Sequence, residues 1–208
     1  MQKRSKKLTP KSIKRKLAVF KHKTDEAKKT IQPDLLEFLF ALGMEGERSA
    51  VVLGAERINV ALETLLKKFL RPSPNTNDTL FASDGALATF SRKIEVAYRL
   101  GLIDPRFKQA LNSIRKLRND FAHATKVERL QEQSHADRVK ALWTLVEKSN
   151  ESKLEGFVLA FQESGEQAAQ YLSCVMLLLL KLELVRHHLE RPYILLPAKL
   201  NYREKDSD

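Results

Sequence analysis

From residue 31 onward, apolar side chains recur at three- and four-residue steps, the spacing that gives a helix one continuous apolar face. The clearest run lies between Glu45 and Leu70. A second run follows Asp104 and Pro105, a residue pair suited to a helix cap and a first helical turn. No segment alternates apolar and polar residues as a strand does, and no internal repeat is visible. The sequence therefore predicts an all-α fold, a single bundle of about six to eight helices.

Turn residues set the expected boundaries of these helices. Residues 71–78 contain two prolines and several Asn and Asp residues, which predicts a loop. Ser83 or Asp84 can cap the next helix, and Gly101 is expected to end it in a left-handed conformation. The remaining helices are expected at residues 136–146 and 154–189, the latter interrupted near Gly165.

Positive charge is concentrated at the N-terminus. Residues 1–30 hold 12 basic and two acidic side chains, whereas the other 178 residues hold 25 basic and 24 acidic ones. Blocks of like charge are usually disordered or bind a polyanion. We therefore expect a basic N-terminal arm at residues 1–30 that is disordered or partly helical, an all-helical domain at 31–191 and a C-terminal tail at 192–208.

The basic arm predicts contact with nucleic acid, because lysine and arginine neutralise phosphates and release their counterions. The alternative is a solubilising tail, or one that touches an acidic partner or ribosomal RNA without specificity. The arm does not by itself predict recognition of a particular base sequence. The candidate nucleic-acid-binding residues are Lys3, Arg4, Lys6, Lys7, Lys11, Lys14, Arg15, Lys16, Lys21 and Lys23.

Several classes of protein are disfavoured by what the sequence lacks. A single cysteine, Cys174, excludes an internal disulfide framework and favours a reducing, cytoplasmic setting. No phosphate-binding glycine loop, zinc-protease motif or serine-hydrolase elbow is present, so we expect no cofactor. We also expect no metal site, since the adjacent His187 and His188 point about 100° apart on a helix. No membrane partner is expected, because the longest apolar run, from Cys174 to Leu180, is too short to span a bilayer.

One polar group stands out, at residues 114–123. Arg118 falls within the apolar stripe of its predicted helix, where a guanidinium needs a carboxylate or an anion beside it. His123 lies five residues on, about 140° around the helix, and Asn119 shares the face of His123. Arg118 and His123 could converge only if the helix frays before His123, or if a second subunit supplies one of them. Arginine and histidine together suit phosphodiester cleavage, but the residues alone favour a structural network at a helix end, with ligand or nucleotide binding as a further alternative.

Two segments resemble a known family. The residues LATFSRKIEVAYRLGLI at 87–103, followed by IRKLRNDFAH at 114–123, are similar to the mannitol operon repressor (MltR-like) family. The resemblance implies an all-helical fold, self-association as a homodimer and a role as a transcriptional regulator. That family has no evident helix-turn-helix, and the basic arm is an addition to its core.

A second resemblance overlaps the first. Arg118-Asn119 followed by His123 is similar to the Arg-polar-x-x-x-His motif of HEPN domains, which are helical and often dimeric. Many of these domains are metal-independent endoribonucleases in toxin–antitoxin and antiviral systems. The resemblance implies that Arg118 and His123 would be catalytic and that Asn119 would position them. Some toxin members place a tyrosine two residues after the histidine, where this chain has Thr125.

Three hypotheses about function follow. The leading one is a non-enzymatic regulator of the mannitol-repressor type, a homodimer that contacts nucleic acid through its basic arm and recognises a regulatory protein or a small ligand. The second is a HEPN-type ribonuclease. The third is a helical interaction module in which Arg118 pairs internally with an acid such as Glu63 or Glu95.

Overall fold

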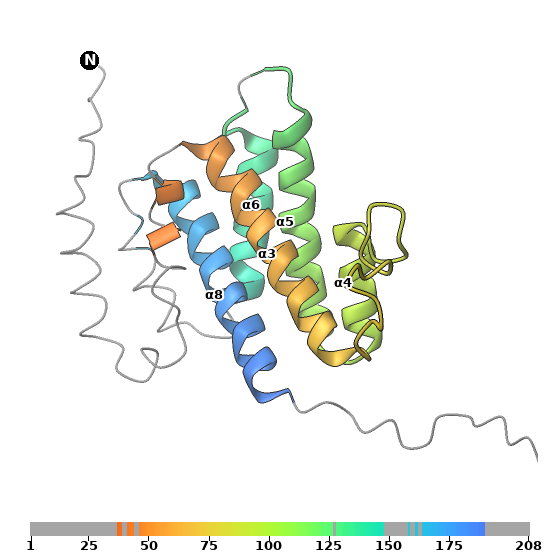
Figure 1. Ribbon diagram of the computed structural model, residues 1–208. Helices are drawn as coiled ribbons and strands as arrows, with labels where there is room; N and C mark the ends of the chain where they lie inside the picture. The colour runs from red at the N-terminus through yellow and green to blue at the C-terminus, as the bar shows by residue number, and fades with distance from the viewer. Residues whose placement is uncertain are drawn as a thin grey trace, which may run out of the picture.

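The chain folds into long helices joined by loops (Figure 1). Those described from end to end are α3 (Glu47–Phe69), α4 (Phe90–Arg99), α5 (Pro105–His123), α6 (Gln133–Glu147) and α8 (Glu166–His188). Four of them contact one another in a ring, in which α3 lies between α5 and α8 while α6 joins α8 back to α5. α5 runs in the opposite direction to the other three (Figure 1). α4 packs outside this ring, on α3 and α5.

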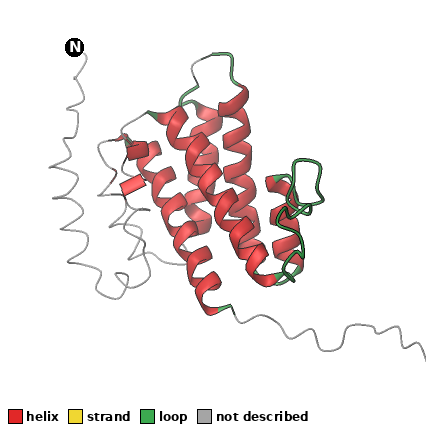
Figure 2. Cartoon of the chain, in the orientation of Figure 1, coloured by secondary structure: helices red, strands yellow, loops and turns green. Residues whose placement is uncertain are grey.

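This computed structural model describes residues 37–38, 41–43, 46–126, 128–147, 158, 161 and 164–189. Helix accounts for 73% of these residues, and none of them lies in a strand (Figure 2). The prediction of an all-α bundle with about six to eight helices is therefore confirmed. The expected basic arm at 1–30 and the tail at 192–208 lie outside the described residues.

α8 has the most apolar surface of the described helices. All residues from Tyr171 to Leu180 are buried, so every side of this helix is covered. By length and composition alone it could also cross a membrane, with a mean hydropathy of 1.7, but 72% of its apolar window is buried inside the protein. A helix that is apolar all round and covered by its neighbours is typical of a protein core. α8 begins after Gly165, at φ +92°, where the sequence predicted an interruption.

The junction between α4 and α5 follows the local rules for helix ends. Asp104 caps α5, with its Oδ1 accepting a 2.7 Å hydrogen bond from the amide of Phe107, and Pro105 occupies the first turn. Gly101 follows the end of α4 at φ +72°, a left-handed conformation that glycine adopts without strain. Both boundaries are where the sequence predicted them.

The start of α4 differs from the prediction. We expected Ser83 or Asp84 to cap this helix, but it begins only after Thr89, whose side chain is the cap. The chain before Thr89 forms tight turns instead of helix. A Cβ atom at Gly85 would lie 2.3 Å from the carbonyl oxygen of Thr79, so glycine is required for this close approach.

A buried lysine joins α4 to α3. Lys93 is 3% exposed, and its Nζ donates to Glu63 Oε2 at 2.6 Å and to Asn59 Oδ1 at 3.2 Å. Glu63 also accepts a 2.6 Å hydrogen bond from Lys67, one helical turn further on. Burial by itself raises the pKa of Glu63, but the hydrogen bonds and charges of the two lysines outweigh it and lower that pKa below its ordinary value. The network therefore fixes α4 on α3 through an ammonium group that is shielded from water.

The core also buries two groups that titrate when exposed to water. Tyr171 is fully buried, and its hydroxyl donates a 3.0 Å hydrogen bond to the carbonyl of Val51, which links α8 to α3. Cys174, the single cysteine of the chain, is 0% exposed. Burial raises the pKa of both groups well above their ordinary values, so both remain protonated at neutral pH.

Removing Glu63 and removing Lys93 should lower the stability of the protein by different amounts. Glu63→Gln leaves the buried ammonium of Lys93 without a carboxylate and should lower the free energy of unfolding by about 3 kcal/mol. Lys93→Met leaves Glu63 paired with Lys67 and should cost only about 1 kcal/mol. Urea unfolding of both variants measures the difference. Equal costs, or a larger cost for Lys93→Met, would contradict this view of the network.

Candidate functional site

Arg118 lies in the second half of α5, on the side of the helix near α3. Its side chain is 35% exposed, and its Nη2 lies 3.7 Å from Oε2 of Glu56 on α3. Its Nη1 donates a 3.1 Å hydrogen bond to Oδ1 of Asn119. The guanidinium is therefore held between two acceptors at the protein surface.

Arg118 lies further from the core than the apolar pattern of its helix predicted. The buried residues of α5 are Leu111, Ile114 and Phe121, together with Ala110 and Leu117. At 100° per residue, these two residues move the centre of the buried face to roughly 55° from Arg118. Arg118 therefore lies at the edge of the packed face, where its charge keeps contact with water.

The prediction that Arg118 pairs with Glu63 or Glu95 is also wrong. Glu63 is engaged by two lysines, and Glu95 pairs with Lys108 at 2.6 Å. Glu56 lies about two turns of α3 before Glu63, closer to the end of the bundle that holds the C-terminus of α5. Because α3 and α5 run in opposite directions, the later part of α5 meets the earlier part of α3.

His123 is the last residue of α5 and is exposed. The helix continues without a break from Arg118 to His123, so the two side chains point about 140° apart and their positions are about 7.5 Å apart along the axis. Fraying of α5, which would bring them together within one chain, is absent from the described residues. Asn119 is bonded to Arg118, and His123 makes no hydrogen bond or ion pair to any residue that the structure describes.

A cation from α3 lies at the C-terminus of α5, and the sequence pattern did not indicate it. Arg48, in the first turn of α3, donates a 3.3 Å hydrogen bond to the carbonyl of Ala122. A positive charge at this position favours the C-terminus of a helix, where carbonyl groups lack partners. Only the antiparallel packing of α3 and α5 brings these two residues together, and no local sequence signal shows it.

A second group was also missed, in the loop that joins α5 to α6. Glu128, Glu132 and His135 place oxygen and nitrogen atoms suitable for metal binding within 4.8 Å of one another. Glu132 follows Glu128 by four residues and His135 follows Glu132 by three, a spacing from which their proximity could have been predicted. By contrast, His187 and His188 are exposed near the end of α8, with ring centroids 5.2 Å apart and edge to face.

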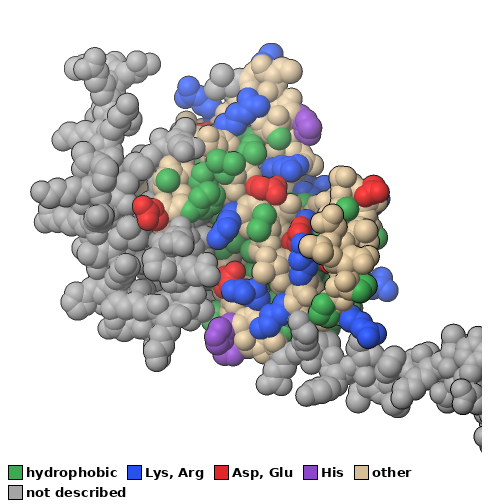
Figure 3. All heavy atoms as spheres, in the orientation of Figure 1, with side chains coloured by type: hydrophobic (Ala, Val, Ile, Leu, Met, Phe, Trp, Pro, Cys, Tyr) green, Lys and Arg blue, Asp and Glu red, His purple; other side chains and the backbone are tan. Residues whose placement is uncertain are grey.

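Charges of both signs are interspersed on the face of the bundle seen in Figure 3. Lysine and arginine side chains lie among acidic and apolar ones over α3 and its neighbours (Figure 3). This face therefore differs from the basic arm, where 12 of 30 residues are lysine or arginine.

No family model matches the chain, and neither curated proteins nor solved structures give a match to it. The resemblance to the mannitol operon repressor family therefore depends on residues 87–103 and 114–123 alone. In the structure these segments contribute α4 and the second half of α5, two helices that are in contact.

The exposed position of Arg118 predicts a small effect of its removal. We expect Arg118→Ala to change the free energy of unfolding by no more than about 1 kcal/mol, because partly exposed ion pairs contribute little to stability. Urea unfolding of the purified variant measures this change. A decrease of about 3 kcal/mol would instead mean that the guanidinium is buried in solution.

Proposed function

We propose that the protein is a non-enzymatic transcriptional regulator of the mannitol operon repressor type, a repressor or co-repressor that acts in the cytoplasm as a homodimer. Its basic arm contacts nucleic acid. The observation that carries this proposal is the separation of charge, with a net +10 on residues 1–30 and a nearly neutral remainder. A cationic segment joined to a body of mixed charge can supply affinity for phosphates while the body keeps its surface for a regulatory protein or small ligand.

The geometry of α5 supports a role without catalysis. Arg118 is held by Glu56 and Asn119, and His123 points elsewhere on the same helix. General acid–base catalysis needs a proton-transferring group within hydrogen-bond reach of the reacting atoms that the arginine would stabilise. A single chain does not offer that arrangement at these residues.

An exposed apolar pair on α3 supports self-association. Leu53 is 42% exposed and Val60 is 45% exposed. They are seven residues apart, so they lie on one side of α3, and Glu56 lies between them. Exposed apolar side chains next to charged ones fit the mixed composition of an interface.

The proposed arm contact predicts that DNA affinity depends on its charge. Changing the ten candidate arm residues to glutamine should abolish binding of a labelled DNA duplex of about 30 base pairs at about 0.1 M salt. At lower salt it should reduce the slope of log affinity against log salt by about 0.9 for each phosphate that the arm no longer neutralises. Fluorescence anisotropy over a salt series measures both quantities.

A matched control separates the arm from the rest of the protein. Arg99, Lys116 and Lys140 are exposed, so their triple change to glutamine should leave affinity and slope nearly unchanged. Equal binding by wild type and the arm variant would refute nucleic-acid contact through the arm.

One observation favours a second function, that of a HEPN-type ribonuclease. Arg118 and His123 are both accessible and lie near the same end of α5, on the helix that neighbours the exposed pair Leu53 and Val60. A second copy docked across a two-fold axis could therefore bring its histidine to the arginine of the first. Guanidinium would then stabilise charge at phosphorus while imidazole moves the proton of the 2′-hydroxyl.

Cleavage of RNA tests the second function against the first. Under the regulator proposal, we expect wild type to leave both single-stranded and structured RNA intact in the presence of a chelator. Cleavage that disappears in His123→Ala but is retained in His188→Ala, a control at another exposed histidine, would establish the ribonuclease instead. Gel analysis of labelled RNA after incubation with each purified protein gives the answer.

A further inference from the structure

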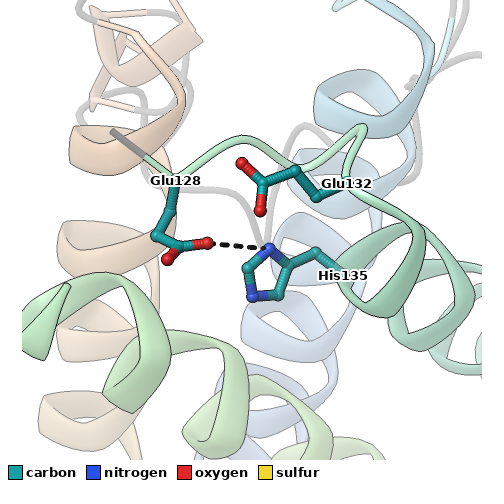
Figure 4. A group of neighbouring side chains, drawn as sticks. All are labelled: Glu128, Glu132 and His135. Carbon is teal, nitrogen blue, oxygen red and sulfur yellow. Dashed lines mark ion pairs between the residues drawn. The ribbon is translucent and has the colours of Figure 1, made fainter. Parts of the chain in front are cut away.

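The loop between α5 and α6 brings three metal-type donors to one point. Glu128 and Glu132 come from the loop, and His135 from the first turn of α6. Figure 4 shows the two carboxylates and the imidazole converging on the space between them. This group takes no part in the function proposed above.

The distances within the group suit a coordination sphere. Zinc binds nitrogen and oxygen at about 2.0–2.2 Å, so neighbouring ligand atoms around it lie roughly 3.0–3.5 Å apart. Nδ1 of His135 lies 3.6 Å from Oε2 of Glu128 and 3.2 Å from the carbonyl oxygen of Arg129. The donor atoms of all three residues lie within 4.8 Å of one another. Because Oε1 of Glu132 accepts from the amide of Arg129, its other carboxylate oxygen remains for an ion.

The imidazole is held in a fixed orientation. His135 is 5% exposed, and its ring lies 5.1 Å from the ring of Phe121. Its Nε2 faces Oδ2 of Asp120 at 3.8 Å, and Asp120 is itself bound by Arg138. Metal-binding histidines commonly present their second nitrogen to a carboxylate, which leaves the first nitrogen free to bind the ion. The carbonyl of Arg129 can only accept, so its hydrogen bond with Nδ1 uses an Nδ1–H. An ion at Nδ1 would replace that hydrogen bond, with the proton on Nε2, toward Asp120.

The loop is also anchored before any ion binds. The amide of Leu130 donates a 2.6 Å hydrogen bond to Glu47 of α3. The amide of Arg129 donates to Glu132 at 3.2 Å. Because these two adjacent amides between the glutamates are already held, binding costs less conformational entropy than it would in a free loop.

We propose that Glu128, Glu132 and His135 bind a divalent transition-metal ion of the zinc type, which ties the loop to α6. Two carboxylates balance the charge of the dication, and one imidazole nitrogen favours zinc over magnesium, which prefers an all-oxygen set. The ion has a structural role, because it joins residues of one short segment. No metal site was expected from the sequence, and the proposed site replaces that expectation.

Titration of the full chain tests the site. After treatment with a chelator and its removal, isothermal titration with zinc chloride should show one ion bound per chain, and zinc should raise the melting temperature. Magnesium chloride should do neither. Glu132→Gln and Glu128→Gln should each weaken zinc binding at least about tenfold. Glutamine keeps an oxygen that accepts hydrogen bonds, so circular dichroism should show both variants folded.

A control separates this site from other histidines. His187→Gln/His188→Gln removes the exposed pair on α8 and should leave zinc binding unchanged. The proposal is overturned if wild type binds no zinc. It is equally overturned if binding survives both glutamate variants or disappears only in the double histidine variant. None of these results depends on nucleic-acid binding or RNA cleavage, so the site and the proposed function stand or fall separately.

Discussion

The apolar surface of α8 is the constraint on which the rest of the bundle depends. Residues Tyr171 to Leu180 are buried on every side, so this helix is stable in water only when other elements surround it. α3 and α6 pack along it, and α5 then contacts both of these helices. The hydroxyl of Tyr171 donates to the carbonyl of Val51 and that of Ser173 to the carbonyl of Ala169, so these buried hydroxyl groups are satisfied.

Polar contacts then fix α4 and α5 along one side of α3. Arg48 reaches the end of α5, Glu56 meets Arg118, and Glu63 meets Lys93 of α4. These three residues of α3 are eight and seven positions apart, so they lie on nearly the same side of the helix. The three interactions differ in energy, because only Lys93 is shielded from water, and they therefore contribute unequally to stability.

Much of the fold could be predicted from local sequence, but the site could not. Asp104 with Pro105, and Gly101, act on backbone groups within three residues of themselves, so their positions in the sequence were sufficient to place helix ends. The partner of Arg118 depends on which turn of α3 lies opposite it, and that is decided by packing between distant segments. The start of α4 was predicted wrongly for a related reason, since the approach of Gly85 to a carbonyl six residues earlier is invisible in a pattern of single residues.

The burial of Cys174 has a practical consequence. Because the chain holds a single thiol and it lies in the middle of α8, a thiol-reactive dye can label the native protein only when the core opens. The rate of labelling in native buffer therefore records the opening of the central helix rather than fraying at the ends. The natural sequence thus already contains a probe of its own core motions, and no engineered cysteine is required.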